Sequence, residues 1–328
     1  MAEPKVTKYL LIEKAVITEG ATISFDIYSR SHDAQSVEIF MEKEHLIDGD
    51  DKIRVAEVDA LYIRKDDREL YDEYFGSHLR TIAQSHHLPF ETKSVIVYNK
   101  AEKIMKQMFQ DPDALGNAEV YEEVVDDLIF TILDNDFTVA SLMRIAAHDY
   151  YTHTHSINVS IYSLSLGNYL GLKGEELKDL GSAALLHDLG KSKVDYEIIN
   201  KNGKLTTNEY NEMKLHPSQG DVIARNLGIV NKRILSGIRS HHEKLDGSGY
   251  PDQLKDSAIG LFPRIIGICD IFDALTTKRS YKDPMTTFNT FKLIKNQMQG
   301  HLDEKLLNNF ILMLRKEDEM RAINEEKA

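Results

Sequence analysis

Cysteine is nearly absent from this sequence of 328 residues, which contains a single one, Cys269. An internal disulfide is therefore impossible, and a reducing cytoplasm is the expected environment. No apolar run approaches the roughly 18 residues that predict a membrane-spanning helix. The first ten residues, MAEPKVTKYL, also lack the basic flank and apolar core of a signal peptide. These absences predict a cytoplasmic protein without a membrane span.

Positive charge is scarce relative to negative charge. The chain carries 40 Lys and Arg residues against 53 Asp and Glu residues, which gives a formal net charge of -13. A nucleic-acid groove or a contact with an anionic membrane needs clustered Lys and Arg. We therefore expect no DNA or RNA polymer as a partner, and any phosphate site must create its positive field locally.

Runs with a period of two residues characterise the N-terminal part of the chain. In ATISFDIYSR, the apolar residues Ile23, Phe25 and Ile27 alternate with their neighbours, and SVEIFME places Ile39 in the same kind of pattern. Such alternation is typical of half-buried strands. Residues 8–65 are therefore predicted to form a small, mostly antiparallel β domain.

Helical spacing replaces this pattern after the β domain. The run ELYDEYFGSHLRTIAQS predicts a connecting helix that ends near Pro89. All of the following chain has the periodicity of packed helices. The predicted helices are 91–110, 117–134, 137–150, 153–170, 174–188, 206–214, 217–226, 230–243, 261–276, 286–299 and 302–315.

The sequence thus predicts a mainly α protein of two domains. Residues 1–85 are expected to form a β-rich regulatory or partner-binding domain with its connecting helix, and residues 86–328 an all-helical domain. The N-terminal domain has no cofactor motif and no acidic pocket pattern of a phosphorylated receiver domain. Its role stays open between sensing, partner binding and formation of a homodimer. The helices at 91–134 are candidates for transmitting the state of this domain to the helical domain.

Histidines are concentrated in the helical part. Seven of the thirteen lie between residues 148 and 242, and none lies between 88 and 147. Imidazole and carboxylate without cysteine suit divalent Fe, Mn or Zn in a catalytic role. Seven candidate ligands are too many for one tetrahedral ion with an open position, which favours two ions bridged by a carboxylate. The candidates are His155, His187, Asp188, His216, His241, His242 and Asp270.

Each of these motifs also has an ordinary structural interpretation. An isolated HD dipeptide is often a packed or exposed helix end, and His216 before Pro217 is compatible with a simple helix start. Adjacent side chains on a helix point about 100° apart, so His241 and His242 cannot share one narrow apolar stripe. At least one of the two must do something other than pack, and the glycines that follow them predict a loop close to a ligand.

With HDLGK, HP, HHEKLDGSGYP and ICDIFDALTTKRSYK in this order, the sequence resembles the HD-GYP family of cyclic di-GMP phosphodiesterases, a branch of the HD metal phosphohydrolases. The resemblance covers roughly residues 137–315. It implies an all-helical phosphohydrolase domain with two or three metal ions, most often iron or manganese. We expect two ions here, because Tyr151 stands where members with a third metal have a glutamate.

The resemblance also implies a role for each motif residue. One ion would be bound by His155, His187, Asp188 and Asp270, and the second by Asp188, His216, His241 and His242. Asp188 would then bridge the two ions. The catalytic residues would be Asp188 and Lys191, and the substrate contacts Lys191, Tyr250, Arg279 and Lys282.

The expected reaction is hydrolysis of cyclic di-GMP to pGpG, GMP or both, by a hydroxide held between the two metals. Lys191 would stabilise charge on the phosphoryl oxygens. Two alternatives stay open. One is a related HD phosphohydrolase that acts on another nucleotide, and the other is a catalytically weak receptor that binds cyclic di-GMP and signals through protein contacts.

Overall fold

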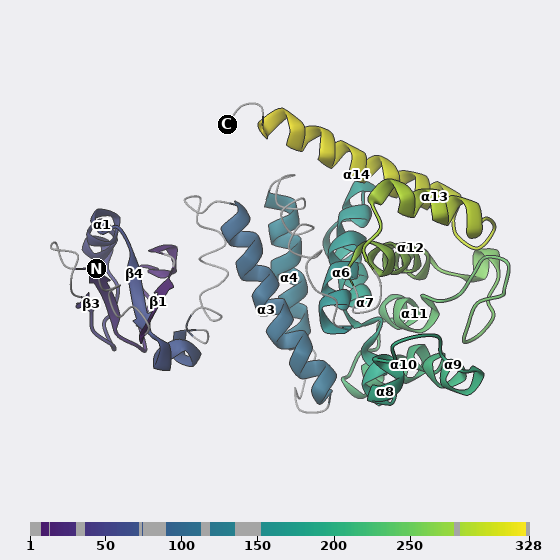
Figure 1. The fold of residues 1–328 in the computed structure, drawn as a ribbon, viewed down its shortest axis with the longest axis horizontal. Helices are drawn as coiled ribbons and strands as arrows, with labels where there is room; N and C mark the ends of the chain where they lie inside the picture. Colours follow the sequence, from purple (N-terminus) through teal and green to yellow (C-terminus); the bar gives the residue numbers. More distant parts are fainter. Residues whose placement is uncertain are drawn as a thin grey trace. The chain divides into compact units, whose positions relative to one another are not determined.

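The computed structural model describes residues 8–12, 14–30, 37–71, 74, 90–112, 119–134, 152–278 and 283–325. These residues form many helices and one small antiparallel sheet near the N-terminus (Figure 1). The predicted fold class, mainly helical with a β-rich N-terminal part, is confirmed. Contacts divide the chain into two units, residues 1–93 and 94–328. The boundary at residue 85 and the regulatory role of the N-terminal part stay predictions.

The N-terminal unit contains a four-stranded sheet with the order β1-β4-β2-β3. All paired neighbours are antiparallel, as the alternating pattern predicted. The described elements of this unit are β1 (Tyr9–Ile12), η2 (Lys14–Val16), β2 (Ile27–Arg30), β3 (Val37–Met41), α1 (Gly49–Glu57), β4 (Leu61–Arg64) and η3 (Lys65–Asp67).

Two details of this unit differ from the prediction. Ile39 is 52% exposed, and its pairing with Tyr28 places it on the sheet face opposite Ile27. A register irregularity at Ile27 and Tyr28 accommodates an extra residue of β3 and shifts the alternation. Helix α1 was not predicted, although Asp48 and Asp51 form a capping box at its start.

The second unit is helical among its described residues. Its elements are α3 (Phe90–Gln110), α4 (Glu119–Asp134), α6 (Thr152–Tyr169), α7 (Gly174–Leu186), η4 (Leu189–Lys193), α8 (Tyr196–Ile199), α9 (Thr207–Met213), α10 (His216–Asn226), α11 (Lys232–Ser240), η5 (Asp256–Ala258), α12 (Leu261–Thr276), α13 (Thr287–Gln297) and α14 (Glu304–Glu325). The predicted helices agree with these within a few residues, except that α14 continues ten residues past 315. The short α8 was not predicted, and the predicted helix 137–150 lies outside the described residues.

Helix α6 lies at the centre of the helical unit. Its residues from Thr154 to Gly167 are all buried, and it packs against α7 and α12 (Figure 1). Three of its buried serines donate to backbone carbonyls, as where Ser160 donates to the carbonyl of Gly181 at 3.0 Å. A helix enclosed in this way holds its side chains in defined positions. Side chains that α6 directs toward α7 and α12 are therefore well placed to build a rigid site.

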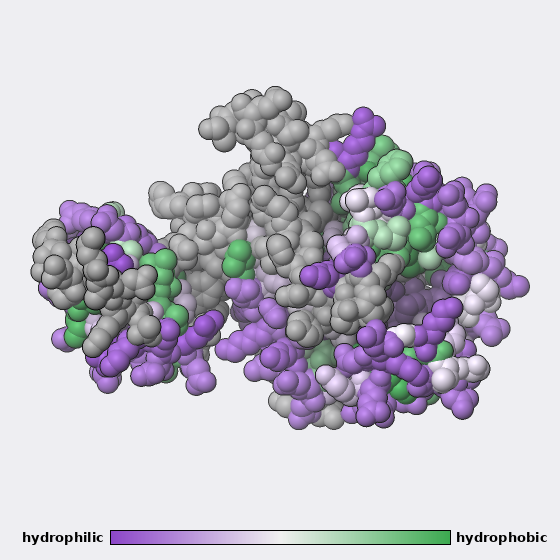
Figure 2. Space-filling view, viewed as in Figure 1, coloured by the Kyte–Doolittle hydropathy of each residue, from purple (hydrophilic) through white to green (hydrophobic). Residues whose placement is uncertain are grey.

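The surface contrasts with this interior. In the view of Figure 2, most of the coloured surface is hydrophilic and the apolar areas are small. Of the helices that the structure describes, none has both the length and the apolar character to cross a membrane.

Candidate metal centre

The structure brings the seven predicted metal ligands together in the helical unit. They come from helix ends and short connections that converge on one buried region, with Asp270 contributed by the middle of α12. His155 is in the first turn of α6, His187 is the C-cap of α7, Asp188 precedes η4, His216 begins α10, His241 is the C-cap of α11 and His242 follows it.

Three of the histidines are held by the same kind of hydrogen bond to the backbone. In each, Nδ1 lies 2.7 Å from the backbone carbonyl oxygen three residues earlier, at or near the end of a helix. Carbonyls in the last turn of a helix lack an intrahelical partner, so they can accept this bond. Because a carbonyl only accepts, Nδ1 carries the proton and the lone pair of Nε2 is available to a metal. The pairs are His187 with Ala184, His216 with Met213 and His241 with Ile238.

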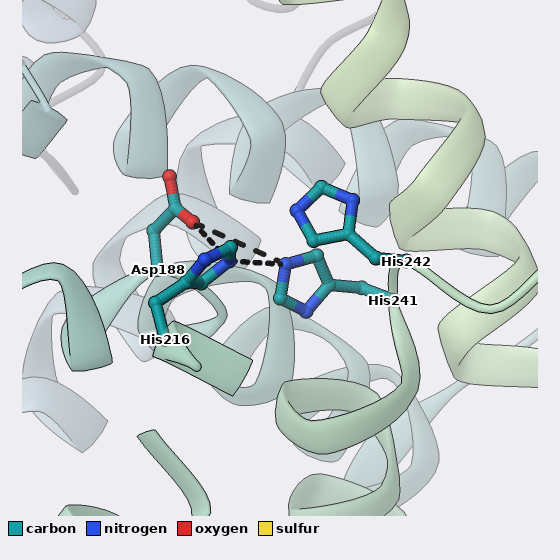
Figure 3. A group of neighbouring side chains, drawn as sticks. All are labelled: Asp188, His216, His241 and His242. Atoms are coloured by element: carbon teal, nitrogen blue, oxygen red, sulfur yellow. Dashed lines mark hydrogen bonds and ion pairs between the residues drawn. The ribbon is translucent and has the colours of Figure 1, made fainter. Parts of the chain in front are cut away.

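The ligands form two groups that share one carboxylate. The groups are His155, His187 and Asp188, and Asp188, His216, His241 and His242, each with its ligand atoms within 4.8 Å of one another. Figure 3 shows the second group, in which the three imidazoles gather on one side of the aspartate.

The two oxygens of Asp188 face different groups. Oδ2 lies 3.6 Å from Nε2 of His155 and 3.5 Å from Nε2 of His187. Oδ1 lies 3.2 Å from Nε2 of His216 and 4.0 Å from Nε2 of His241 (Figure 3). This is the arrangement that a bridging carboxylate between two cations requires.

Asp270 adds a second carboxylate from α12. Its Oδ1 lies 3.1 Å from Nε2 of His155, and its Oδ2 lies 3.7 Å from Nδ1 of His242. Asp270 therefore lies between members of the two groups. Its expected place beside His155 is compatible with this geometry.

Buried polar atoms at the centre lack ordinary partners. Within the described part of the chain, Nε2 of His187 and Oδ1 of Asp188 are buried without a hydrogen-bond partner. Leaving such an atom unsatisfied costs roughly 1–3 kcal/mol. A divalent cation in each group would coordinate one of these atoms, Nε2 of His187 in the first group and Oδ1 of Asp188 in the second, and the affinity of such ions for nitrogen and oxygen suits this donor set. The residues present thus fit a pair of metal ions.

The electrostatics keep the ligands in their metal-binding protonation states. Burial lowers the pKa of His187, and burial together with the nearby imidazoles places that of His241 well below its usual value. Burial also lowers the pKa of His242 to about 3. These imidazoles are therefore neutral at pH 7, the form that binds metals.

For the two carboxylates, neighbouring groups oppose the effect of burial on the pKa. Burial alone would raise the pKa of Asp188, but the Lys191 ammonium and the imidazole of His187 hold it well below its usual value. The pKa of Asp270 is also lowered, because its interactions with the imidazoles of His155 and His242 outweigh the effect of burial. Both carboxylates are ionised at neutral pH.

Two predicted substrate-contacting residues border the centre. The Nζ atom of Lys191, on η4, lies 2.5 Å from Oδ2 of Asp188. The ring of Tyr250 stacks on that of His242, with centroids 4.7 Å apart and an interplanar angle of 30°. Arg279 and Lys282, the other predicted substrate contacts, lie outside the described residues, as does Tyr151.

Glycines allow neighbouring sequence motifs to pack closely. A Cβ atom at Gly190 would lie 1.9 Å from the carbonyl oxygen of His216, so only glycine permits η4 to approach α10. This contact brings the HDLGK motif next to the HP motif. A Cβ atom at Gly249 would lie 2.5 Å from Cα of Glu243, which shows that the GYP loop folds back onto the HHE segment.

The GYP loop is also held by a carboxylate. Glu243 accepts the backbone N–H of Asp252 at 2.6 Å and that of Leu254 at 3.0 Å. Glu243 therefore shapes the loop that carries Tyr250.

Sequence reasoning did not assign a role to Asp273, one helical turn after Asp270. Asp273 is fully buried and its Oδ2 lies 2.7 Å from Nδ1 of His155. The only signal in the sequence was its spacing of three residues from a candidate ligand, which places both on one side of α12.

Comparison with known proteins identifies the family of this chain. The family described as "HD domain" matches residues 140–306, about half of the chain, and the chain belongs to this family. The resemblance to HD-GYP proteins, drawn from the motifs, is confirmed.

Individual relatives cover the chain to different extents. The chain is 30% identical over 221 residues to "Cyclic di-GMP phosphodiesterase PA4108" of Pseudomonas aeruginosa, an alignment that covers 66% of this chain and 53% of the relative. It is 38% identical over 176 residues to "3'3'-cGAMP-specific phosphodiesterase 2" of Vibrio cholerae, covering 52% and 33%. The chain thus spans about half the length, or less, of these curated relatives.

A solved structure shares the fold. "Bd1817, a HDG"Y"P protein from Bdellovibrio bacteriovorus" superposes with a TM-score of 0.66 and 18% identity, covering 94% of this chain and 99% of that one. This likeness extends over both units and supports the fold alone.

Replacement of Gly190 by alanine should damage the centre. The added methyl group would collide with the carbonyl of His216, so η4 and α10 must separate, at a cost of about 1–3 kcal/mol or more. The expected result is a lower unfolding temperature and fewer metal ions bound per chain, measured by calorimetry and elemental analysis. Gly260→Ala is the control, because a Cβ there meets its nearest atoms at 3.7 Å. An equal unfolding temperature and metal content in the two variants would show that close packing at Gly190 does not matter for the centre.

The metal-free protein should lose stability as the pH falls from about 6.5 to about 5. In the unfolded chain a histidine takes up a proton below its ordinary pKa of about 6.5, whereas burial keeps His187, His241 and His242 neutral in the fold. Each such imidazole reduces the free energy of unfolding by up to about 1.4 kcal/mol per pH unit in this window. The lowered pKa values of Asp188 and Asp270 affect stability only at more acidic pH, below the ordinary aspartate pKa of about 3.9.

This pH dependence is measured as the thermal midpoint in chelator at several pH values. His242→Asn should show a shallower decline than the parent protein. A midpoint that stays constant or rises on acidification would contradict the prediction.

Proposed function

We propose that this protein is a metal-dependent phosphodiesterase that hydrolyses cyclic di-GMP to pGpG, GMP or both. The observation that carries this proposal is the placement of the two Asp188 oxygens, one toward each group of histidines. The match to a relative named as a cyclic di-GMP phosphodiesterase supports the choice of substrate.

Two divalent ions, iron or manganese, are the proposed cofactors. His155, His187, Asp188 and Asp270 would hold one, and Asp188, His216, His241 and His242 the other. When bound, such a pair supplies Lewis acidity, which makes water nucleophilic at neutral pH and stabilises charge on a phosphoryl oxygen.

The charges of the chain's own residues favour an anionic substrate. Asp188 and Asp270 carry two negative charges, and an imidazole that coordinates a metal through its lone pair is neutral, so two divalent ions leave net positive charge. An acidic chain can thus attract a phosphodiester at one place. The Lys191 ammonium lies beside Asp188 and would stabilise the charge that develops on a phosphoryl oxygen bound at the centre.

Tyr250 would border the substrate from the GYP loop. Burial and nearby carboxylate charge raise the pKa of Tyr250, so its phenol is neutral and can donate a hydrogen bond. Its ring is positioned by stacking on His242. Arg279 and Lys282 are proposed as further phosphate contacts on the basis of the motif alone.

Another cyclic dinucleotide, 3'3'-cGAMP, is a second candidate substrate. It is favoured by the 38% identity to a relative named as specific for this compound. The chemistry would be the same, because both compounds contain phosphodiester bonds that the centre could attack. A receptor without catalytic activity is less consistent with a complete set of ligands around Asp188.

We infer a cytoplasmic location from the single cysteine, which is typical of proteins in a reducing compartment. The N-terminal domain, residues 1–85, is proposed as the regulatory part, through partner binding or formation of a homodimer. Cross-linking of the full chain with and without cyclic di-GMP tests whether a homodimer forms.

The central test is hydrolysis of cyclic di-GMP and 3'3'-cGAMP by protein purified without oxygen and loaded with Fe²⁺ or Mn²⁺. Asp188→Asn removes the shared anionic ligand, so we expect metal content to fall and turnover to drop by at least about 10³-fold, a loss of about 4 kcal/mol of transition-state stabilisation. Glu175→Gln, a substitution of an exposed residue on α7, is the control and should retain the metal content and the turnover of the parent protein. Full turnover by Asp188→Asn would refute the assignment of the site.

Lys191→Met separates charge stabilisation from metal binding. This variant keeps much of the side-chain length but removes the ammonium, so kcat should fall about 10²-fold or more while two metal ions stay bound. Chromatographic product analysis and elemental analysis give the two readouts. An unchanged kcat would exclude Lys191 from catalysis, and loss of the metals would assign it a structural role instead.

A further inference from the structure

His155 is held differently from the other histidines that bond through Nδ1. It lies in the first turn of α6, where the carbonyl of Thr152 instead accepts a hydrogen bond from the Ser156 hydroxyl. Nδ1 of His155 bonds to a side chain from another helix, Oδ2 of Asp273 on α12, at 2.7 Å. The orientation of this imidazole therefore depends on how α12 is placed against α6.

Asp273 is itself the centre of a buried hydrogen-bonded array. Its Oδ1 accepts from Nδ2 of Asn158 at 3.0 Å and from the hydroxyl of Thr277 at 2.8 Å. Asp273, Asn158 and His155 are each at most 1% exposed, so water contributes little to their solvation. A carboxylate buried in this way needs such donors to offset the cost of its desolvation.

The array extends to α3. The amide of Asn158 donates to Asp273 and accepts, through Oδ1, the hydroxyl proton of Tyr98 at 2.8 Å. An amide whose oxygen is bonded in this way cannot rotate by 180° without losing both bonds. Burial, aided by the carboxylates of Asp273 and Glu102, raises the pKa of Tyr98, which keeps its hydroxyl a donor.

We propose that Tyr98 is a positioning residue for His155 and acts through Asn158 and Asp273. The Tyr98 hydroxyl orients the Asn158 amide, the amide and Thr277 orient the Asp273 carboxylate, and that carboxylate holds the proton on Nδ1 of His155. Nε2 of His155 then points its lone pair toward Asp188 and Asp270. The inference rests on the proposed function only in treating His155 as a metal ligand.

The array makes the placement of α3 relevant to the metal centre. Lys100, two residues beyond Tyr98, pairs with Glu123 at 2.7 Å and with Asp127 at 2.8 Å, both on α4. Helix α4 is in turn paired with α7 through Lys178, which contacts Asp126 at 3.2 Å. A displacement of α3, the first helix of its unit, would therefore reach His155 through hydrogen bonds as well as through packing.

The test compares Tyr98→Phe, which removes only the hydroxyl, with Tyr121→Phe. Tyr121 is a buried tyrosine on the neighbouring helix α4, 2% exposed, and serves as the matched control. In metal-free protein, nitrogen NMR of labelled histidines should show a smaller population of the Nδ1–H tautomer of His155 in Tyr98→Phe. The dissociation constant for Mn²⁺, from competition with a chelator, should rise about 10-fold, as for other partners of metal ligands.

A double-variant comparison shows whether Tyr98 acts through Asp273. Asp273→Asn alone should weaken Mn²⁺ binding by about 10–100-fold, and adding Tyr98→Phe should weaken it no further. If Asp273→Asn does not fold, Asn158→Ala provides the second background, with the same expectation. If the losses of Mn²⁺ affinity in the two single variants add up in the double variant, Tyr98 does not act through Asp273 and the proposal is overturned.

The proposal is also overturned if Tyr98→Phe matches Tyr121→Phe in both tautomer and Mn²⁺ affinity. Failure of the wild-type protein to bind Mn²⁺ or Fe²⁺ would instead count against the proposed function. In that case the tautomer of His155 still decides whether Tyr98 positions it, because this measurement needs no metal.

Discussion

The shared carboxylate of Asp188 is the interaction on which the centre depends. Burial opposes its ionisation, yet the Lys191 ammonium and the surrounding imidazoles keep its pKa well below the usual value. Its two oxygens can therefore face two separate groups of histidines as an anion. Without this charge, Asp270 and the imidazoles would have to hold two cations in a buried space, where uncompensated charge is costly. The other features of the site serve to hold ligands around this aspartate.

The fold supplies these ligands mainly from helix ends. At the ends of α7, α9 and α11, carbonyl groups without intrahelical partners accept the Nδ1 proton of a histidine. The same bond satisfies the carbonyl, fixes the tautomer and aims Nε2 at the centre. His155 has no such carbonyl and relies on Asp273, which connects its orientation to α12 and, through Asn158, to α3. Three ligands are thus set by local structure, and one by packing between helices.

The proposed function follows from charge as much as from motif. The chain has a net charge of -13, so an anion would be attracted where bound metal ions reverse the local sign. The ligand set, Lys191 and Tyr250 lie together at such a place, and the relatives with similar sequences are named as phosphodiesterases of cyclic dinucleotides. The discrimination between cyclic di-GMP and 3'3'-cGAMP must come from contacts to the base, because the phosphodiester chemistry is the same.

The sequence by itself determined the ligand types, the helices that carry them and the family, because periodicity, local motifs and helix-end signals act over a few residues. It also indicated the mainly α fold and the antiparallel pairing of the N-terminal strands. It did not reveal the exposure of Ile39, which depends on an irregular register with β2, nor the need for glycine at position 190, which depends on the approach of α10. Tertiary structure alone decided which oxygen of Asp188 faces which histidines, and that Tyr98 and Asp273 support His155. The hydrogen bonds that support His155 join residues 60 and 118 positions apart, so their geometry is set by helix packing and has no signature in local sequence.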